Sequence, residues 1–169
     1  MTEGKVQKQN VGNAGEYYIA ARLSALDFTA TLTLGRAEKY DILALSPKVK
    51  IIKISVKTTQ LNKLNNFPLS VKDESGYSKD FFYAFVKLNG FNKEPDFWII
   101  PSERVCFVLG SYYRKWMSTT NKNGEKHKGS NIRLLDLLNL ESRDVIKKFY
   151  PKNWSEEVKK YYKNLEQLV

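Results

Sequence analysis

Residues 40–60, with the sequence YDILALSPKVKIIKISVKTTQ, constrain the fold of this chain more than any other stretch. Apolar and polar side chains alternate on both sides of a Ser-Pro pair, and the second half is rich in β-branched residues. This pattern predicts two antiparallel strands, over residues 40–45 and 50–58, joined by a bend around Pro47. Asp41 lies inside the first strand, so the register of the hairpin decides where a carboxylate points.

The register that we predict places Asp41 directly opposite Ser55. A register that turned the carboxylate toward the isoleucines would bury a charge without a partner, which is costly. Because side chains alternate along a strand, Ser55 and Lys57 lie on one face of the second strand, and Ile54 and Val56 lie on the other. The hairpin is therefore expected to gather Asp41, Ser55 and Lys57 in one polar patch.

A helix is predicted before the hairpin. It should begin within residues 13–15 and end near Ala25, because Glu16, Ile19 and Leu23 recur on one stripe at helical spacing. Glu16 is thus expected on the side of the helix that packs against the sheet, within reach of the polar patch.

Two carboxylates, a hydroxyl and an ammonium group in one patch have a plain chemical use. Oxygen ligands hold Mg²⁺ or Mn²⁺, the ion lowers the pKa of a bound water, and a nearby lysine stabilises negative charge at a phosphate. This combination indicates hydrolysis of phosphodiesters. The structural alternative is an isolated Asp41–Lys57 pair across the sheet, with Glu16 as a favourable acid in the first turn of the helix. Spacing alone leaves both interpretations open.

The rest of the chain predicts an α/β fold, with a central mixed sheet of four to five strands flanked by helices. Ser102 is expected to cap a helix that ends near Trp116, and Ser155 a helix in the tail. The length fits a single domain over residues 1–169. Further strands are predicted over residues 28–34, 81–89 and 95–101. The predicted parts of the domain are a core over 12–117, a basic loop over 118–130 and a C-terminal helical extension over 131–169.

The charge balance indicates a polyanionic partner. The chain has 28 Lys and Arg residues against 18 Asp and Glu residues, a formal net charge of +10. Nucleic acid is the leading candidate, and a solvated lysine-rich surface is the alternative. Positive charge is concentrated next to aromatic residues between positions 112 and 133, a pairing that suits phosphates and stacked bases. The predicted nucleic-acid contacts are Arg114, Lys115, Lys122, Lys126, Lys128 and Arg133.

Several site types are excluded or disfavoured by composition. Cys106 is the single cysteine and lies in an apolar stretch, so a buried side chain is expected. His127 is the single histidine, which excludes metal sites built from Cys and His, and it receives little catalytic weight. No apolar run is long enough to span a membrane and no signal-peptide pattern is present, so a cytoplasmic protein is expected.

Three segments, in this order, resemble the PD-(D/E)XK nuclease superfamily: GNAGEYYIAARLSALDF at 12–28, YDILAL at 40–45 and SVKTTQ at 55–60. In its archaeal Holliday-junction-resolvase-like and small bacterial branches, a helix with a glycine and a glutamate precedes a strand reading Asp-Ile-(Leu/Ile)-Ala. A strand reading (Glu/Gln)-Val-Lys-(Thr/Ser) follows. The resemblance covers roughly the first 60 residues. It implies a restriction-endonuclease-like fold and cleavage of nucleic acid, DNA foremost, with Mg²⁺ or Mn²⁺.

The resemblance also implies roles for individual residues. Asp41 would be the principal metal ligand, Glu16 the helix carboxylate that assists it, and the backbone carbonyl of Val56 a further ligand. Lys57 would position water or stabilise charge at the phosphorus. Ser55 stands where the superfamily has a second acid or a glutamine.

The serine is a departure from the pattern with chemical consequences. A neutral hydroxyl contributes far less than a carboxylate to the binding of a hard cation. Either Glu16 replaces the missing acid or cleavage is weak or absent, and Glu38 in the loop before Asp41 is a further replacement candidate. The alternative function is therefore a catalytically weak or inactive protein of this fold that binds nucleic acid or a DNA-processing partner. RNA or an acidic protein as the ligand stays open, and so does a homodimer, because members of the superfamily are often dimers.

Overall fold

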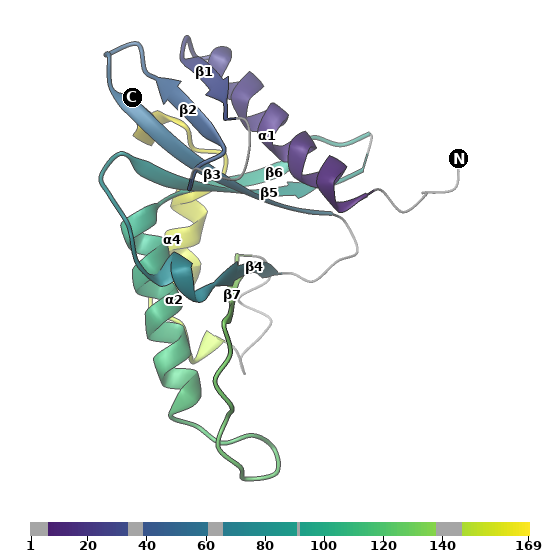
Figure 1. The fold of residues 1–169 in the computed structure, drawn as a ribbon, viewed down its shortest axis with the longest axis vertical. Helices are drawn as coiled ribbons and strands as arrows, with labels where there is room; N and C mark the ends of the chain where they lie inside the picture. The colour runs from purple at the N-terminus through teal and green to yellow at the C-terminus, as the bar shows by residue number, and fades with distance from the viewer. Residues whose placement is uncertain (1–6, 34–38, 61–65, 91, 138–146) are drawn as a thin grey trace. The chain divides into compact units, whose positions relative to one another are not determined.

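A computed structural model describes residues 7–33, 39–60, 66–90, 92–137 and 147–169 (Figure 1). Contacts divide the chain into two compact units. Unit 1 comprises Met1–Lys63, Asp80–Ile100 and Tyr161–Val169, and unit 2 comprises Leu64–Lys79 and Pro101–Lys160. Within the described ranges, no helix has both the length and the apolar character that crossing a membrane requires.

Unit 1 is built on a five-stranded sheet with the strand order β1-β2-β3-β5-β6. Strands β1, β2 and β3 pair antiparallel, whereas β3 and β5 pair parallel. The sheet is therefore mixed, which confirms the predicted α/β class with four to five central strands. The elements are α1 (Lys8–Ser24), β1 (Thr29–Leu32), β2 (Ile42–Leu45), β3 (Ile51–Gln60), β5 (Phe81–Leu88), β6 (Asp96–Pro101) and the short helix η3 (Glu166–Leu168).

The hairpin of β2 and β3 has the predicted register. Ile42 pairs with Ile54, and Leu43 pairs with Lys53. The bend is closed by the Ser46 N–H, which donates to the Lys50 carbonyl at 2.9 Å. Polarity alone predicted this register, because a shift by one residue would exchange the two faces of the hairpin.

Helix α1 covers one face of this sheet (Figure 1). Ile19 and Leu23 pack in one core with Ile42, Ile54 and Val56, and all five side chains are buried. The helix begins at Lys8, earlier than predicted, and no side chain caps its first turn, so the sequence there carries no start signal.

Gly15 brings α1 close to β3. A Cβ atom at Gly15 would overlap the hydroxyl of Thr58. By contrast, a Cβ atom at Gly12, on the same helix, would meet nothing within 4 Å. Gly15 therefore sets how near the helix lies to the strand that carries Lys57.

In the part of the chain that the structure describes, unit 2 contains a two-stranded sheet together with helices. Strand β4 pairs antiparallel with β7, and α2 contacts both β7 and η1. The extension predicted to be helical thus includes a strand, β7. The elements are β4 (Asn66–Ser70), the short helix η1 (Val71–Glu74), α2 (Ser102–Met117), β7 (Ile132–Asp136) and α4 (Trp154–Tyr161).

Ser102 does not cap α2 as predicted. Pro101 occupies the cap position, and Ser102 is the first residue of the helix. The Ser102 hydroxyl is fully buried, accepts a hydrogen bond from the Ser78 N–H at 3.2 Å and donates to the Ser78 carbonyl at 3.1 Å. A partner 24 residues away in the sequence takes the place of the helix amide groups.

Candidate functional site

Asp41 lies immediately before β2, and its carboxylate is bound to β3. The Oδ2 atom accepts hydrogen bonds from the Val56 N–H at 2.6 Å and from the Ser55 hydroxyl at 3.2 Å. The Asp41 N–H donates to the Ile54 carbonyl at 2.8 Å. The carboxylate therefore takes the position that a backbone carbonyl of β2 would occupy if the pairing continued.

The backbone of Val56 faces the same carboxylate. In an antiparallel pair, the N–H and the C=O of a residue point to the same side of its strand. The Val56 carbonyl is consequently directed toward the side on which Asp41 lies. Both of these hydrogen bonds of the Asp41 carboxylate end on the same oxygen, Oδ2.

Glu16 is brought to this site by α1. Burial raises the pKa of Glu16, the negative charge of Asp41 raises it further, and the positive charge of Lys57 lowers it. Glu16 is thus close enough to both Asp41 and Lys57 for their charges to act on it. Glu16 lies in the interior of α1, which has no acidic residue in its first turn, so the alternative of Glu16 as a first-turn acid is wrong.

The site is buried at its base and open at its charged groups. Ser55 and Val56 are 4% and 8% exposed, whereas Glu16, Asp41 and Lys57 are partly exposed. The charged groups of the site are therefore in contact with solvent, whereas its base belongs to the protein interior. Glu38, the loop acid considered as a replacement ligand, lies outside the described residues.

The oxygen donors fit a hard cation, although they are few. Two carboxylates and a backbone carbonyl are the groups that Mg²⁺ and Mn²⁺ prefer, and the repulsion between Glu16 and Asp41 is what a cation would relieve. In the part of the chain that the structure describes, no group of three or more His, Cys, Asp or Glu side chains is arranged to hold a metal ion. The site therefore carries less ligand charge than one with an acid at position 55.

Five of the six predicted nucleic-acid contacts are exposed. Arg114 and Lys115 are in the last turns of α2, and the three lysines lie in the loop that follows it. The exposed residues are Arg114, Lys115, Lys122, Lys126 and Lys128.

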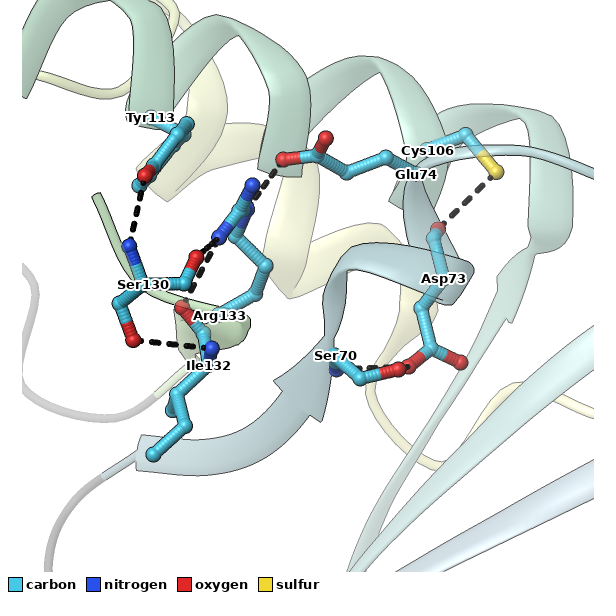
Figure 2. A network of polar contacts seen from close by, with 8 residues as sticks. All are labelled: Ser70, Asp73, Glu74, Cys106, Tyr113, Ser130, Ile132 and Arg133. Carbon is cyan, nitrogen blue, oxygen red and sulfur yellow. Dashed lines mark hydrogen bonds and ion pairs between the residues drawn. The ribbon is translucent and has the colours of Figure 1, made fainter. Parts of the chain in front are cut away.

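Arg133 is not on the surface, which corrects that part of the prediction. Its side chain is 5% exposed and forms an ion pair with Glu74. Its guanidinium also donates to the carbonyl oxygens of Ser130 and Ile132 and lies over the ring of Tyr113, 3.4 Å from the ring centre (Figure 2). Arg133 is an internal structural residue of unit 2.

Some structural roles had no recognised signal in the sequence. His127 stacks on Trp116, with ring centres 4.0 Å apart, so it belongs to the packing of the basic loop. Cys106 is buried as expected, its thiol donates to the Asp73 carbonyl at 3.2 Å, and burial raises its pKa. The pairing of Arg133 with Glu74 joins residues 59 positions apart and cannot be read from local spacing.

Comparison with known proteins gives little guidance. No protein-family model and no curated protein matches the chain. Among solved structures, the chain is similar to a bacterial homing endonuclease, I-Ssp6803I, at 15% sequence identity and a TM-score of 0.43. The similarity covers 60% of this chain and 70% of that one. This TM-score is too low to establish a common fold, so membership of the PD-(D/E)XK superfamily stays a prediction.

Proposed function

We propose that this protein is a divalent-cation-dependent nuclease that hydrolyses phosphodiester bonds, with DNA as the expected substrate. The observation that carries the proposal is the convergence of Glu16, Asp41 and Lys57. Burial and the negative charge of Asp41 raise the pKa of Glu16 at a partly exposed site, and the positive charge of Lys57 acts on the same carboxylate. A perturbed carboxylate with a specific charged neighbour is typical of functional sites. The formal charge of +10 favours a polyanionic substrate.

Each residue has a role in this proposal. Mg²⁺ or Mn²⁺ would be held by Oδ1 of Asp41, by Glu16 and by the Val56 carbonyl. The ion would make a bound water more acidic and would polarise a phosphate oxygen. Lys57 stabilises the negative charge that develops on the phosphate. Ser55 orients Asp41 through its hydroxyl hydrogen bond and adds no charge.

The second candidate is a protein of this fold that binds nucleic acid without cutting it. Ser55 favours this candidate, because a site with two carboxylates holds a cation more weakly than a site with three. The hydrogen bonds of Asp41 to β3 also give that residue a structural use that needs no metal. The homodimer expected from the resemblance stays a prediction under either candidate.

The test is plasmid nicking with Mg²⁺ or Mn²⁺ by the wild type and by Asp41→Asn. The asparagine side-chain oxygen can still accept from Val56 and Ser55, so the fold is retained, but the charge that binds the cation is gone. We expect Asp41→Asn to lower the cleavage rate by about 100-fold or more.

The matched control is Asp27→Asn, which removes an acid from the turn after α1. It should cleave at the wild-type rate. Cleavage by Asp41→Asn at that same rate would assign the activity to another site or to a contaminant. Intact plasmid with the wild type in both metals would leave the non-cutting candidate.

A further inference from the structure

The segment from Arg114 to Asn131, which we call the basic arm, combines an excess of positive charge with aromatic neighbours. It contains five Lys and Arg residues and one acid, Glu125. All five cationic side chains are exposed. The chain leaves the end of α2, turns, and runs back beside the helix to β7 (Figure 1).

The basic arm is folded by its own hydrogen bonds. The Asn121 side-chain oxygen accepts from the N–H groups of Asn123 and Glu125, both at 2.9 Å, and the Asn121 N–H donates to the Glu125 carbonyl at 2.8 Å. Gly124 takes a φ of +79°, which glycine adopts without strain. These bonds make a tight turn, with Thr120 bridged to Lys126. The backbone at Lys122 and Lys126 is thus ordered by contacts within the protein.

The aromatic side chains of this region are engaged within the protein. Trp116 stacks on His127 and is tilted against Tyr113, whose ring lies under Arg133. The Tyr113 hydroxyl accepts a hydrogen bond from the Ser130 N–H at 3.0 Å. Single-strand binding proteins instead offer open ring faces on which bases stack. The rings of this region build the arm and leave the charges outside.

Arg133 stabilises the end of the basic arm through contacts inside unit 2. Its guanidinium holds the carbonyl of Ser130, at the end of the arm, and is paired with Glu74 of η1 (Figure 2). These contacts reduce the conformational entropy that the arm would lose on binding a ligand, because its backbone is already ordered.

We propose that the basic arm binds the phosphate backbone of double-stranded nucleic acid as a prefolded surface, without stacking on bases. The choice of a nucleic acid rests on the proposed function. Exposed lysines bind phosphates by releasing counterions, in a way that depends on salt and not on base sequence. Because this is a binding step, it can be tested apart from cleavage.

The experiment measures binding of a labelled duplex and of each of its single strands, by fluorescence anisotropy in EDTA at several salt concentrations. The wild type should bind the duplex about tenfold more tightly than either strand. The triple variant Lys122→Gln, Lys126→Gln, Lys128→Gln should weaken duplex binding by about tenfold. It should also lower the slope of log Kd against log salt by up to about 0.9 for each lysine that contacts a phosphate.

The matched control is Lys48→Gln, Lys93→Gln, Lys152→Gln, three exposed lysines outside the basic arm. It removes the same charge and should change duplex binding by less than about threefold. Equal losses in the two triple variants would overturn the inference in favour of diffuse attraction. Equal binding of single strands that is lost in Trp116→Ala would overturn it in favour of base stacking. Absence of binding to any nucleic acid would overturn it outright.

These outcomes are separable from those of the proposed function. Duplex binding through the arm, together with an uncut plasmid in every metal, supports this inference and removes the nuclease. Cleavage that depends on Asp41, together with no effect of the arm lysines on binding, supports the nuclease and removes this inference.

Discussion

Both units bring charged side chains together beside a strand. The protein itself compensates the charges in unit 2, but it compensates those in unit 1 only in part. In unit 2, the Arg133 guanidinium is paired with Glu74, donates to two carbonyl oxygens and covers an aromatic ring. In unit 1, Glu16 and Asp41 repel each other across a partly open site, and Lys57 offsets only part of that repulsion. The cluster in unit 2 is satisfied by the protein alone, whereas the cluster in unit 1 would gain from a bound cation.

The difference separates a structural cluster from a functional one. An ion pair whose buried guanidinium is already hydrogen-bonded within the protein does not need a ligand. Removing one partner leaves the other charge unpaired, which lowers stability. A carboxylate whose pKa is raised by burial and by a second carboxylate is typical of functional sites. Three substitutions test this contrast, each by its effect on the free energy of unfolding.

The largest effect is expected from Arg133→Met. Glu74 would lose its partner, and the carbonyls of Ser130 and Ile132 would lose their donor, so the free energy of unfolding should fall by about 3 kcal/mol. The double variant Glu74→Met, Arg133→Met should recover part of that loss, because both charges leave together. Urea denaturation measures all three proteins.

The control for this pair is Lys159→Met, which breaks the exposed pair with Glu156. It should cost less than about 0.5 kcal/mol. If Arg133→Met lowered the free energy of unfolding by no more than this control, the contacts of Arg133 would not stabilise unit 2 as described above.

A smaller loss is expected from Gly15→Ala. The added methyl group overlaps the Thr58 hydroxyl and pushes α1 away from β3, at a cost of about 1–3 kcal/mol. Because Glu16 is the next residue, cleavage should fall as well. Gly15→Ala combined with Thr58→Ala should restore part of the stability, measured by thermal unfolding.

Gly12→Ala is the matched control on the same helix. Its methyl group enters open space, and alanine favours a helix interior, so a gain of about 0.5–1 kcal/mol is expected. A loss at Gly12 equal to that at Gly15 would show that helix propensity, and not the close approach, governs both positions.

The smallest effect, and one of opposite sign, is expected from Glu16→Gln in the absence of divalent cations. Burial and Asp41 raise the pKa of Glu16 above its ordinary value of 4.5, so folding favours the protonated form. The stability contributed by Glu16 is full below that value and is lost as pH rises through the raised pKa. At neutral pH the variant should therefore be more stable than the wild type, by less than about 1 kcal/mol since Glu16 is partly solvated. The difference should vanish in acid.

Thermal unfolding in EDTA across pH measures the Glu16 effect, and added Mg²⁺ should stabilise the wild type more than the variant. Glu103→Gln is the control, because Glu103 is an exposed acid in the first turn of α2 and its removal should not raise stability. A less stable Glu16→Gln at neutral pH would mean that the carboxylates of unit 1 are satisfied, and the contrast between the units would be lost.

The sequence predicted the features that follow from the local pattern of polar and apolar side chains. The placement of Asp41 beside Ser55 followed from keeping a carboxylate off the apolar face, and Arg114 and Lys115, which were predicted to contact nucleic acid, are exposed. These features depend on neighbours within one hairpin or one helix. Local pattern and final structure therefore agree there.

Features that depend on distant partners could not be predicted in this way. Arg133 was expected on the surface, since nothing near it in the sequence indicates that Glu74 and Tyr113 enclose its guanidinium. Ser102 was expected to cap a helix, but its hydroxyl binds the backbone of Ser78. In both cases the polar side chain found its partner in a residue far away in the sequence, whereas the prediction had assumed solvent or a neighbouring backbone group.

The attachment of Asp41 to the Val56 amide has a consequence for comparing related chains. An acceptor at this position completes the sheet whether or not any chemistry follows, so Asp or Asn would be retained there on architectural grounds alone. The ammonium group of Lys57 on β3, by contrast, does not complete the hydrogen bonding of the sheet backbone. An aspartate or asparagine at position 41 of a related chain would therefore indicate that this part of the sheet is kept, and would not by itself indicate a catalytic site.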